Sequence, residues 1–234
     1  MLAFSPILNA YVQSDLFGKF IFFMLFVLSI ISWVILLHKI YMAKKLTALN
    51  AIFEKQTKNS ENLLSINITS NISYPYLDIY KSLKEKTVQI LNKNRFFITD
   101  NKNVYMSTSD IELLDSHLDV QILKQTKKLE KNLFILPTVV TLGPFLGLLG
   151  TVWGILITFN TLQSQSLLNS NASILSGLSM ALATTVVGLM VAIPALIAYN
   201  YLKNWIKNFR NDMTHFSHEL LTTLEIQYRH VDLK

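Results

Sequence analysis

Long apolar runs, separated by one polar stretch, dominate the pattern of hydrophobic and polar positions along the chain. Phe20 to Leu37 is a run of apolar residues broken only by serines. At about 1.5 Å per residue, such a run crosses the hydrocarbon core of a bilayer as one helix. Asn132 to Leu202 contains no Asp, Glu, Lys, Arg or His, as expected for two membrane helices joined by a short polar loop. The pattern therefore predicts three membrane-spanning helices.

These runs divide the chain into predicted segments. In order, we expect an amphipathic helix on the outer surface at 1–15, transmembrane helices at 16–41, 132–160 and 174–202, a cytoplasmic helical region at 42–131, an outer (periplasmic) loop at 161–173 and a cytoplasmic helical tail at 203–234. The predicted fold class is an all-α integral membrane protein, in which long cytoplasmic helices extend the three transmembrane helices.

Local signals mark where helices start and break. Ser5 followed by Pro6 can start the first helix, because serine caps helices and proline suits the first turn. Ser109 and Glu112 have the spacing of a capping box, and the helix that they start is expected to run on towards Leu133. Kinks are expected at the prolines of the second and third spans, which are Pro137, Pro144 and Pro194.

The distribution of basic residues sets the expected orientation in the membrane. The formal net charge is +6, but no basic stretch is interleaved with aromatic residues, so no nucleic-acid site is expected. Basic residues gather on one side of the predicted spans, with Lys19 alone on the other: Lys39, Lys44, Lys45, Lys124, Lys127, Lys128, Lys131, Lys203, Lys207 and Arg210. The positive-inside rule then puts the N-terminus outside and the C-terminus inside.

The composition argues against an enzyme and against a metal site. The chain has no cysteine, and its five histidines lie outside the apolar spans. His215 and His218 are close in sequence but have no further ligands nearby, so a solvated surface pair is expected rather than a metal centre. No Gly-rich loop precedes a Lys-Ser or Lys-Thr pair, which argues against ATP hydrolysis. We therefore expect no cofactor.

Small residues recur at helical spacing in the second and third spans. One stripe runs along the second span at Gly143, Gly147, Gly150 and Gly154. A similar stripe runs along the third span at Gly177, Ala181 and Gly188. Such stripes let helix backbones approach closely in lipid, so the residues are expected at helix contacts. The spacing alone does not show whether these stripes only pack the helices together or also have a functional role.

Threonines beside these stripes are the candidate functional residues, namely Thr151, Thr158, Thr184 and Thr185. A membrane threonine most often donates to a carbonyl of its own helix. A pair near mid-membrane can instead offer hydroxyls to water or to the ionisable group of a partner. The predicted spans contain no acid, base or histidine of their own. A proton or sodium path would therefore need a titratable group from another protein.

Two segments of the spans carry a resemblance to a known family. Gly147 to Ile155 reads Gly-Leu-Leu-Gly-Thr-Val-Trp-Gly-Ile, and Ala183 to Ala195 reads Ala-Thr-Thr-Val-Val-Gly-Leu-Met-Val-Ala-Ile-Pro-Ala. In this order, the segments resemble the MotA/TolQ/ExbB proton-channel family. Three spans are similar to its TolQ/ExbB branch, and the short N-terminus with the first span is closest to TolQ.

This resemblance implies a subunit of a motor driven by the proton-motive force in the bacterial inner membrane. In the family, copies of the chain form a homo-oligomeric ring, a pentamer, around membrane helices of a TolR/ExbD-like single-span protein that carries an Asp. A TolA/TonB-like single-span protein is a further implied partner. Proton flow, with sodium as an alternative, would drive Tol-Pal-type envelope maintenance or Ton-type energised uptake.

The resemblance also assigns residues, with one departure. The pore threonines of the family fall on Thr151 and Thr185. The family usually has Glu five positions before the second of these, whereas this chain has Met180. The alternative function is therefore a non-conducting membrane scaffold, which assembles partner helices through its small-residue faces.

Overall fold

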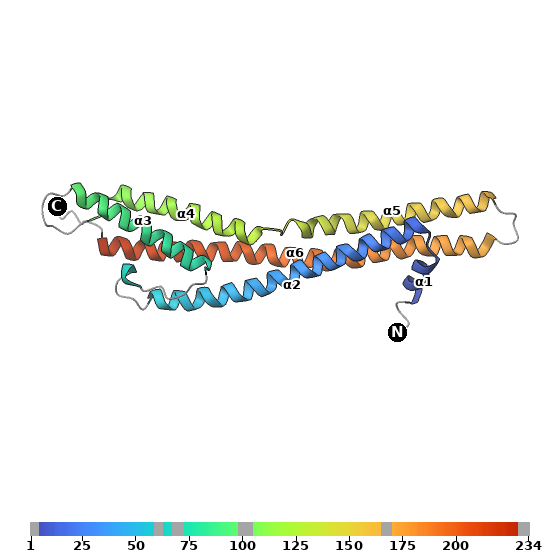
Figure 1. Ribbon diagram of the computed structural model, residues 1–234, viewed down its shortest axis with the longest axis horizontal. Helices are drawn as coiled ribbons and strands as arrows, with labels where there is room; N and C mark the ends of the chain where they lie inside the picture. Colours follow the sequence, from blue (N-terminus) through green and yellow to red (C-terminus); the bar gives the residue numbers. More distant parts are fainter. Residues whose placement is uncertain (1–4, 59–62, 67–72, 98–104, 165–169, 229–234) are drawn as a thin grey trace. The chain divides into compact units, whose positions relative to one another are not determined.

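The computed structural model describes residues 5–58, 63–66, 73–97, 105–164 and 170–228. All of its elements are helical, and three helices are long and apolar enough to cross a membrane. In chain order the elements are α1 (Ser5–Gln13), α2 (Leu16–Lys58), a 3₁₀ turn η1 (Leu63–Ser65), α3 (Pro75–Phe97), α4 (Thr108–Glu130), α5 (Ile135–Ser164) and α6 (Ser170–Tyr228) (Figure 1).

The chain divides into two compact units. The first, here called the membrane unit, comprises residues 1–39 and 132–202, and the second, the polar unit, comprises residues 40–131 and 203–234. The helices α2 and α6 continue without interruption from one unit into the other. The first and third spans therefore form single continuous helices, α2 and α6, with their expected cytoplasmic extensions.

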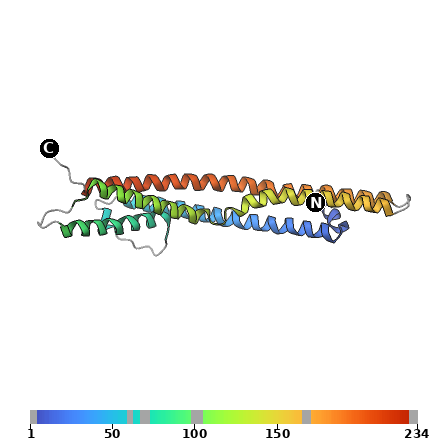
Figure 2. The same ribbon diagram turned by 90° about the horizontal axis from the view of Figure 1, so that it is seen from above.

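In the membrane unit, α5 and α6 run side by side as a helical hairpin (Figures 1 and 2). The start of α2 packs against this pair and contributes the buried side chains of Ile21 and Leu25. On α6 the core positions are small, with Ala181 and Ala195 almost inaccessible. Close helix packing in lipid favours such small residues, because lipid supplies little hydrophobic drive for association.

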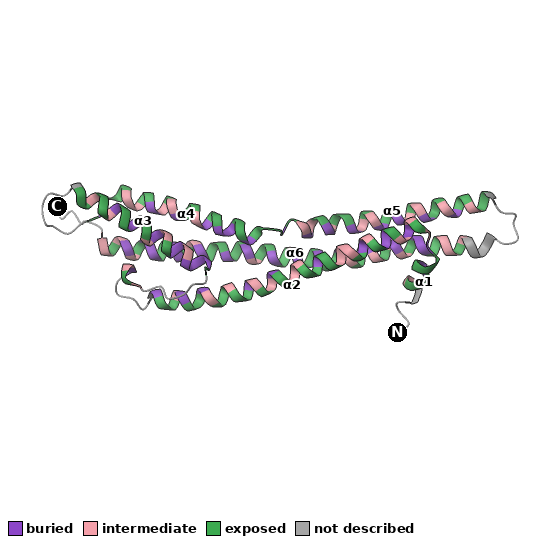
Figure 3. Cartoon of the chain, in the orientation of Figure 1, coloured by how far each residue is buried: buried purple, intermediate pink, exposed green. Residues whose placement is uncertain are grey.

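Many residues of the membrane unit are exposed, as the green stretches of Figure 3 show, and many of these exposed residues are large and apolar. In water, so much exposed apolar surface would favour aggregation, whereas in a bilayer the same surface meets hydrocarbon. Examples from the three long helices are Phe23, Phe26, Val34, Phe145, Val152, Phe159, Leu182 and Ile197. This outward-facing apolar surface agrees with the predicted all-α membrane protein.

Helix α1 is described over Ser5–Gln13 and packs against α2. Its predicted start at Ser5 and Pro6 stays a prediction, because residues 1–4 lie outside the described residues. Ala10 is buried, and the Tyr11 ring meets the Phe22 ring of α2 edge to face, with centroids 5.8 Å apart. Leu8 and Val12 remain exposed. The helix is therefore anchored to α2 through one face, and its other face remains available to lipid.

The polar unit has a core of its own. Leu77, Tyr80 and Leu83 of α3 and Leu114 and Leu118 of α4 are buried at helical spacing. The Tyr80 hydroxyl donates to the carbonyl oxygen of Leu63 at 2.6 Å, and burial raises the pKa of this phenol to about 12.

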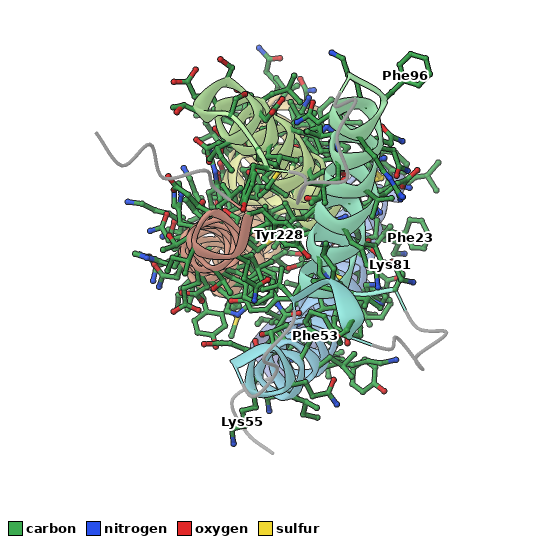
Figure 4. All side chains as sticks on the ribbon, turned by 90° about the vertical axis from the view of Figure 1, so that its left-hand side faces the viewer. Phe23, Phe53, Lys55, Lys81, Phe96 and Tyr228 are labelled. Atoms are coloured by element: carbon green, nitrogen blue, oxygen red, sulfur yellow. The ribbon has the colours of Figure 1, made fainter. Side chains whose placement is uncertain are left out.

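Aromatic and polar contacts complete the polar unit. Phe53 of α2 points into the unit and meets Tyr80 with ring centroids 5.5 Å apart, whereas the neighbouring Lys55 points outward (Figure 4). Between α3 and α4, the Ser82 Oγ lies 2.8 Å from the His117 Nε2.

The capping box lies two residues earlier than predicted. Ser107, not Ser109, caps α4: its hydroxyl accepts from the Asp110 N–H, and the Asp110 carboxylate accepts from the Ser107 N–H. Asp110 takes the role expected of Glu112 because it is the third helical residue after Ser107, the position from which a side chain reaches back to the N-cap backbone.

The helix that follows also ends earlier than expected. It does not run on to Leu133 but stops at Glu130, and Asn132 has a positive φ of 65°. Asparagine tolerates this left-handed conformation better than most residues, so it provides the break between α4 and α5.

Other predicted boundaries also shift. Pro137 lies in the first turn of α5, where its missing N–H costs nothing, and the kink predicted at this residue stays a prediction. Pro144 and Pro194 do lie inside α5 and α6. The hairpin helices extend into the predicted loop at 161–173, to Ser164 and from Ser170, and residues 165–169 lie outside the described residues.

Candidate functional site in the membrane hairpin

The four glycines of the α5 stripe all face α6. A Cβ built on Gly147 would lie 2.9 Å from the Thr185 Cα, and one built on Gly154 would lie 2.9 Å from the Ala181 Cβ. At Gly143 the obstacle is the carbonyl oxygen of Gly188, and at Gly150 it is the Thr184 side chain. These positions therefore form the seam of the hairpin within one chain.

The stripe on α6 forms the other side of this seam. A Cβ on Gly177 would collide with the Thr158 hydroxyl, and one on Gly188 would collide with the backbone of Gly143. Ala181, 1% exposed, fills the space opposite Gly154. Because both backbones approach so closely, any larger side chain at these glycines would have to push the two helices apart.

Two of the four candidate threonines are buried in the seam. Thr184 is fully buried and donates to the carbonyl of Ala181 at 2.8 Å, with the Gly147 carbonyl a second, more distant acceptor at 3.4 Å. Thr158 is buried opposite Gly177 and donates to the carbonyl of Gly154 at 2.8 Å. Both hydroxyls thus bond to backbone that lies within the hairpin.

The other two threonines, assigned to the pore by resemblance, are less buried. The Thr185 hydroxyl crosses the seam and donates to the Gly147 carbonyl at 3.1 Å, which links the two signature segments. The Thr151 hydroxyl donates to the carbonyl of Leu148 at 2.6 Å, on its own helix. The structure therefore brings Thr184 and Thr185 together against Gly147, but it does not bring Thr151 into the same contact.

These hydrogen bonds restrict what the hydroxyls can do. A hydroxyl has one proton to donate and two lone pairs to accept with. In all four threonines the proton already goes to a backbone carbonyl. Each oxygen can still accept from water or from a protonated carboxyl group. To donate a hydrogen bond to a carboxylate, a threonine hydroxyl would first have to break its hydrogen bond to the backbone carbonyl.

Asp15 is a residue of this unit that the sequence reasoning missed. It precedes α2, and its Oδ1 accepts from the Gly18 N–H at 2.9 Å, which is the geometry of an N-cap. Its Oδ2 accepts from the Trp153 Nε1–H at 3.0 Å. Trp153 lies between Thr151 and Gly154 in the signature of α5, and its ring packs on Phe17 with centroids 4.4 Å apart.

A sequence signal for Asp15 does exist. The spacing of Asp15 and Gly18 is that of an N-cap and the third helical residue, directly before the apolar run. The contact with Trp153 has no such signal, because the two residues are far apart in the chain. The spans themselves lack an acid, yet a carboxylate does hydrogen-bond to a side chain of α5.

Met180, the departure from the family pattern, packs beside this carboxylate. It is 4% exposed, and a Cβ built on Gly18 would lie 2.9 Å from its Sδ, its Cε and the Asp15 Oδ1. The methionine therefore points towards the start of α2.

Among the described residues, no group of three or more His, Cys, Asp or Glu could hold a metal ion.

Comparison with known proteins finds relatives that match part of the chain. The biopolymer transport protein ExbB of Aquifex aeolicus is 47% identical over 76 residues, which cover 32% of this chain and 51% of that protein. The Tol-Pal system protein TolQ of Pseudomonas aeruginosa is 44% identical over 84 residues, 35% of each chain. TolQ of Haemophilus influenzae is 37% identical over 106 residues, 44% of this chain and 45% of that protein.

The names of these relatives include both ExbB and TolQ. The matches span about half of each relative's length or less. The sequence profile of the MotA/TolQ/ExbB proton channel family matches residues 82–215, which include α4, α5 and most of α6. With its signature segments packed against each other in the hairpin, the chain belongs to the MotA/TolQ/ExbB proton channel family.

Proposed function

We propose that this protein is a TolQ/ExbB-like subunit of a motor in the bacterial inner membrane that is driven by the proton-motive force. Copies of the chain would form a ring, a pentamer in the family pattern, around the membrane helices of a single-span partner that bears an Asp. Proton flow past that Asp would then do work on the cell envelope. The names of the relatives support either Tol-Pal-type maintenance or Ton-type transport.

The observation that carries this proposal is the contact between the two signature segments. Thr185 on α6 donates to the Gly147 carbonyl on α5, and the surrounding glycines hold the backbones close together. The hydroxyl oxygen keeps lone pairs for an incoming proton donor. A protonated partner carboxyl or a water molecule is such a donor, whereas residues 132–202 of the hairpin contain no Asp, Glu, Lys, Arg or His.

The experiment removes hydroxyls without changing shape. Thr151→Val and Thr185→Val each preserve side-chain volume and remove one hydrogen-bonding group, and Thr141→Val, an exposed position on α5, is the matched control. Complexes purified with their native partners would be reconstituted into liposomes, and proton uptake would be followed with a pH-sensitive dye under a potassium diffusion potential. We expect reduced uptake in each single variant, none in the double variant, and normal uptake in the control.

Normal uptake in an assembled Thr151→Val/Thr185→Val complex would contradict the proposed role of the threonines. The second candidate function is a non-conducting scaffold, which is favoured by Met180 and by hydroxyl protons that are already donated to backbone carbonyls. A scaffold predicts that the wild-type complex, fully assembled with its partners, takes up no protons beyond empty liposomes.

A further inference from the structure

The membrane unit contains a cavity of about 380 Å³ that the function proposed above does not use. Its walls come from α1, α2 and α6, all within the membrane unit. Among the described lining residues, the hydroxyls of Tyr11 and Ser29 are the only polar side-chain groups, and the rest of the wall is hydrocarbon. Small-molecule sites have volumes of roughly 300–1,000 Å³. The cavity therefore has the size of a ligand site and suits an apolar ligand.

The cavity is accessible from the apolar surface of the membrane unit. Phe22 and Leu25 of α2 are buried where they line it, whereas Leu8, Phe23 and Phe26 line it and are more than half exposed. Phe23 and Phe26 also belong to the surface that meets hydrocarbon when the spans lie in a bilayer. Lipid chains thus have direct access to the cavity.

The shape of the lining favours a flexible chain over a second helix. In lipid, helices pack closely where small residues let their backbones approach. The described lining contains no glycine or alanine, and large rings such as those of Phe23 and Phe26 stand at its edge. The glycine stripes of α5 and α6 already face each other in the hairpin seam. An acyl chain can follow such an uneven wall, which keeps the backbone of another helix at a distance.

Lys19 places one positive charge next to this cavity. It precedes Phe22 and Phe23 by three and four residues, so it lies on the same face of α2, one turn nearer the start of the helix. Helical side chains lean towards the N-terminus of their helix. The ammonium group of Lys19 therefore extends away from the apolar run, towards the headgroup level of a bilayer, while its stem stays with the apolar rings.

The charge of Lys19 lacks a counter-ion within the part of the chain that the structure describes. The ion pairs found there involve other residues. Asp15, one turn before Lys19, accepts from the Gly18 N–H and from the Trp153 indole instead. Residues 1–38 and 132–202 contain no other Lys or Arg. An anionic group above the apolar cavity would pair with this single cation.

We propose that the cavity binds an acyl chain of an anionic phospholipid, whose headgroup pairs with Lys19. The chain lies against Phe23 and Phe26 of α2 and against Val187 of α6. Lipid chains gain about as much from one another as from an apolar wall, so the preference over bulk lipid comes from the charge. The site stands whether or not ions pass through the hairpin. It is also independent of which side the N-terminus faces, because phospholipids form both leaflets.

The first test removes the charge. The intact chain in detergent is titrated with phosphatidylglycerol that carries a photoactivatable diazirine on one acyl chain, and cross-linked peptides are identified by mass spectrometry. Lys19→Gln should raise the half-saturating concentration for cross-links to the cavity about fivefold, the effect of one basic side chain beside an anionic lipid surface. Lys44→Gln, at an exposed lysine further along α2, is the matched control and should leave it unchanged. Dioleoylglycerol, which has acyl chains but no phosphate, should compete at least fivefold more weakly than unlabelled phosphatidylglycerol.

The second test fills the cavity. Val187 lines it and is half-buried, whereas its neighbour Val186 is exposed and lies outside the lining. Val187→Phe should therefore abolish cross-links to the cavity, and Val186→Phe, the same change one residue away, should keep them. The thermal midpoint of each variant checks that it is folded. Ser29→Phe blocks the same space from α2 and serves where Val187→Phe does not fold.

Four results would overturn the proposal. Equal competition by dioleoylglycerol, or unchanged binding in Lys19→Gln, would mean ordinary lipid contact without recognition of the headgroup. Cross-links that persist in folded variants with a filled cavity would place the acyl chain elsewhere on the surface. Cross-links that occur in the monomer but not in the assembled oligomer would assign the cavity to a neighbouring copy. Cross-links that appear only after removal of residues 2–4 would assign it to the chain's own N-terminal segment.

Discussion

At the scale of single residues, the hydrogen bond between Asp15 and Trp153 is the main contact that the structure adds to the sequence-based predictions. A carboxylate that also caps α2 binds the indole of the signature segment in α5. This arrangement fixes the start of the first long helix against the hairpin. It also gives Trp153 a function in the fold, in addition to any role that the family signature implies.

We expect Asp15 and Trp153 to be energetically coupled. Asp15→Asn keeps a capping oxygen but loses the charge, and Trp153→Phe keeps an aromatic ring but loses the donor. A double-mutant cycle on the free energy of unfolding in detergent should give a coupling of about 1.5–3 kcal/mol, the range for a hydrogen bond to a charged group. Additive effects of the two substitutions would show that the contact contributes nothing to stability.

Met180→Glu tests the environment that replaces the family carboxylate. The side chain of Met180 is buried beside Gly18 and Asp15. A glutamate there meets a like charge at close range, so we expect destabilisation of roughly 2.5–3.5 kcal/mol. Adding Asp15→Asn should recover part of this loss, because it removes the repulsion. Thermal unfolding of the single and double variants measures both effects, and an unchanged midpoint for Met180→Glu would contradict the expectation.

At the scale of elements, the α5–α6 seam is the feature on which the hairpin depends. Its glycines oppose Thr184, Ala181 and backbone of the same chain, with no room for a side chain. Sequence spacing predicted close contacts at these positions. It did not say whether the contacts lie within one chain or between copies, because a stripe of small residues permits both.

Gly154→Leu should therefore unfold the hairpin and not merely dissociate an oligomer. The added side chain meets Ala181 and the Gly177 carbonyl, and overpacking of this kind costs about 1–3 kcal/mol or more. Val152→Leu, exposed on the same helix, is the control. Protease sensitivity of the detergent-solubilised monomer checks this. A monomer that stays protected while only the oligomer is lost would place Gly154 at a contact between subunits.

The cap of α4 gives a pH-dependent prediction. Burial alone would raise the pKa of Asp110, but hydrogen bonds from the Ser107 backbone, Asn94 and the Ser107 side chain, with the charge of Lys93, lower it below its ordinary value. The carboxylate therefore stabilises the fold above the pKa of an unfolded Asp, about 4, and this contribution is lost as the pH falls through the lower folded value.

Ser107→Ala should cost about 1 kcal/mol at pH 7. The stability difference between wild type and Asp110→Asn should shrink as the pH falls below about 4, because protonation removes the charge that the substitution removes. Chemical unfolding followed by circular dichroism at pH 7 and at about pH 3 measures both effects. A difference that is independent of pH would mean that the carboxylate charge does not support the cap.

At the scale of the whole molecule, composition and periodicity predicted the three spans and the helical polar region. The continuity of α2 and α6 could be anticipated, since no glycine or proline separates span from extension. The break between α4 and α5 at Asn132 could not be anticipated, because a single asparagine is only a weak helix terminator. The contact of Asp15 with Trp153 could not be predicted either, because the two residues lie far apart in the sequence.

The proposed orientation can be tested on the whole chain. Reporter enzymes fused after Lys234 or inserted near Asn101 should report cytoplasm, and one at Ser166 should report the outside, because basic residues gather at one end of the spans and only Lys19 lies at the other. Paired reporters that are active only on opposite sides of the membrane make each position its own control. A cytoplasmic signal at Ser166 would contradict the proposed topology.

The scarcity of acids in the membrane unit has a consequence for spectroscopy. Residues 1–39 and 132–202 contain a single carboxyl side chain, that of Asp15. In infrared difference spectra, a protonated carboxyl group absorbs in a region that the peptide backbone leaves clear. A band from within the bilayer that persists in Asp15→Asn must then come from another protein. With Asp15→Asn, the membrane unit thus adds no carboxyl side-chain band of its own to the signal of a partner's carboxyl group within the bilayer.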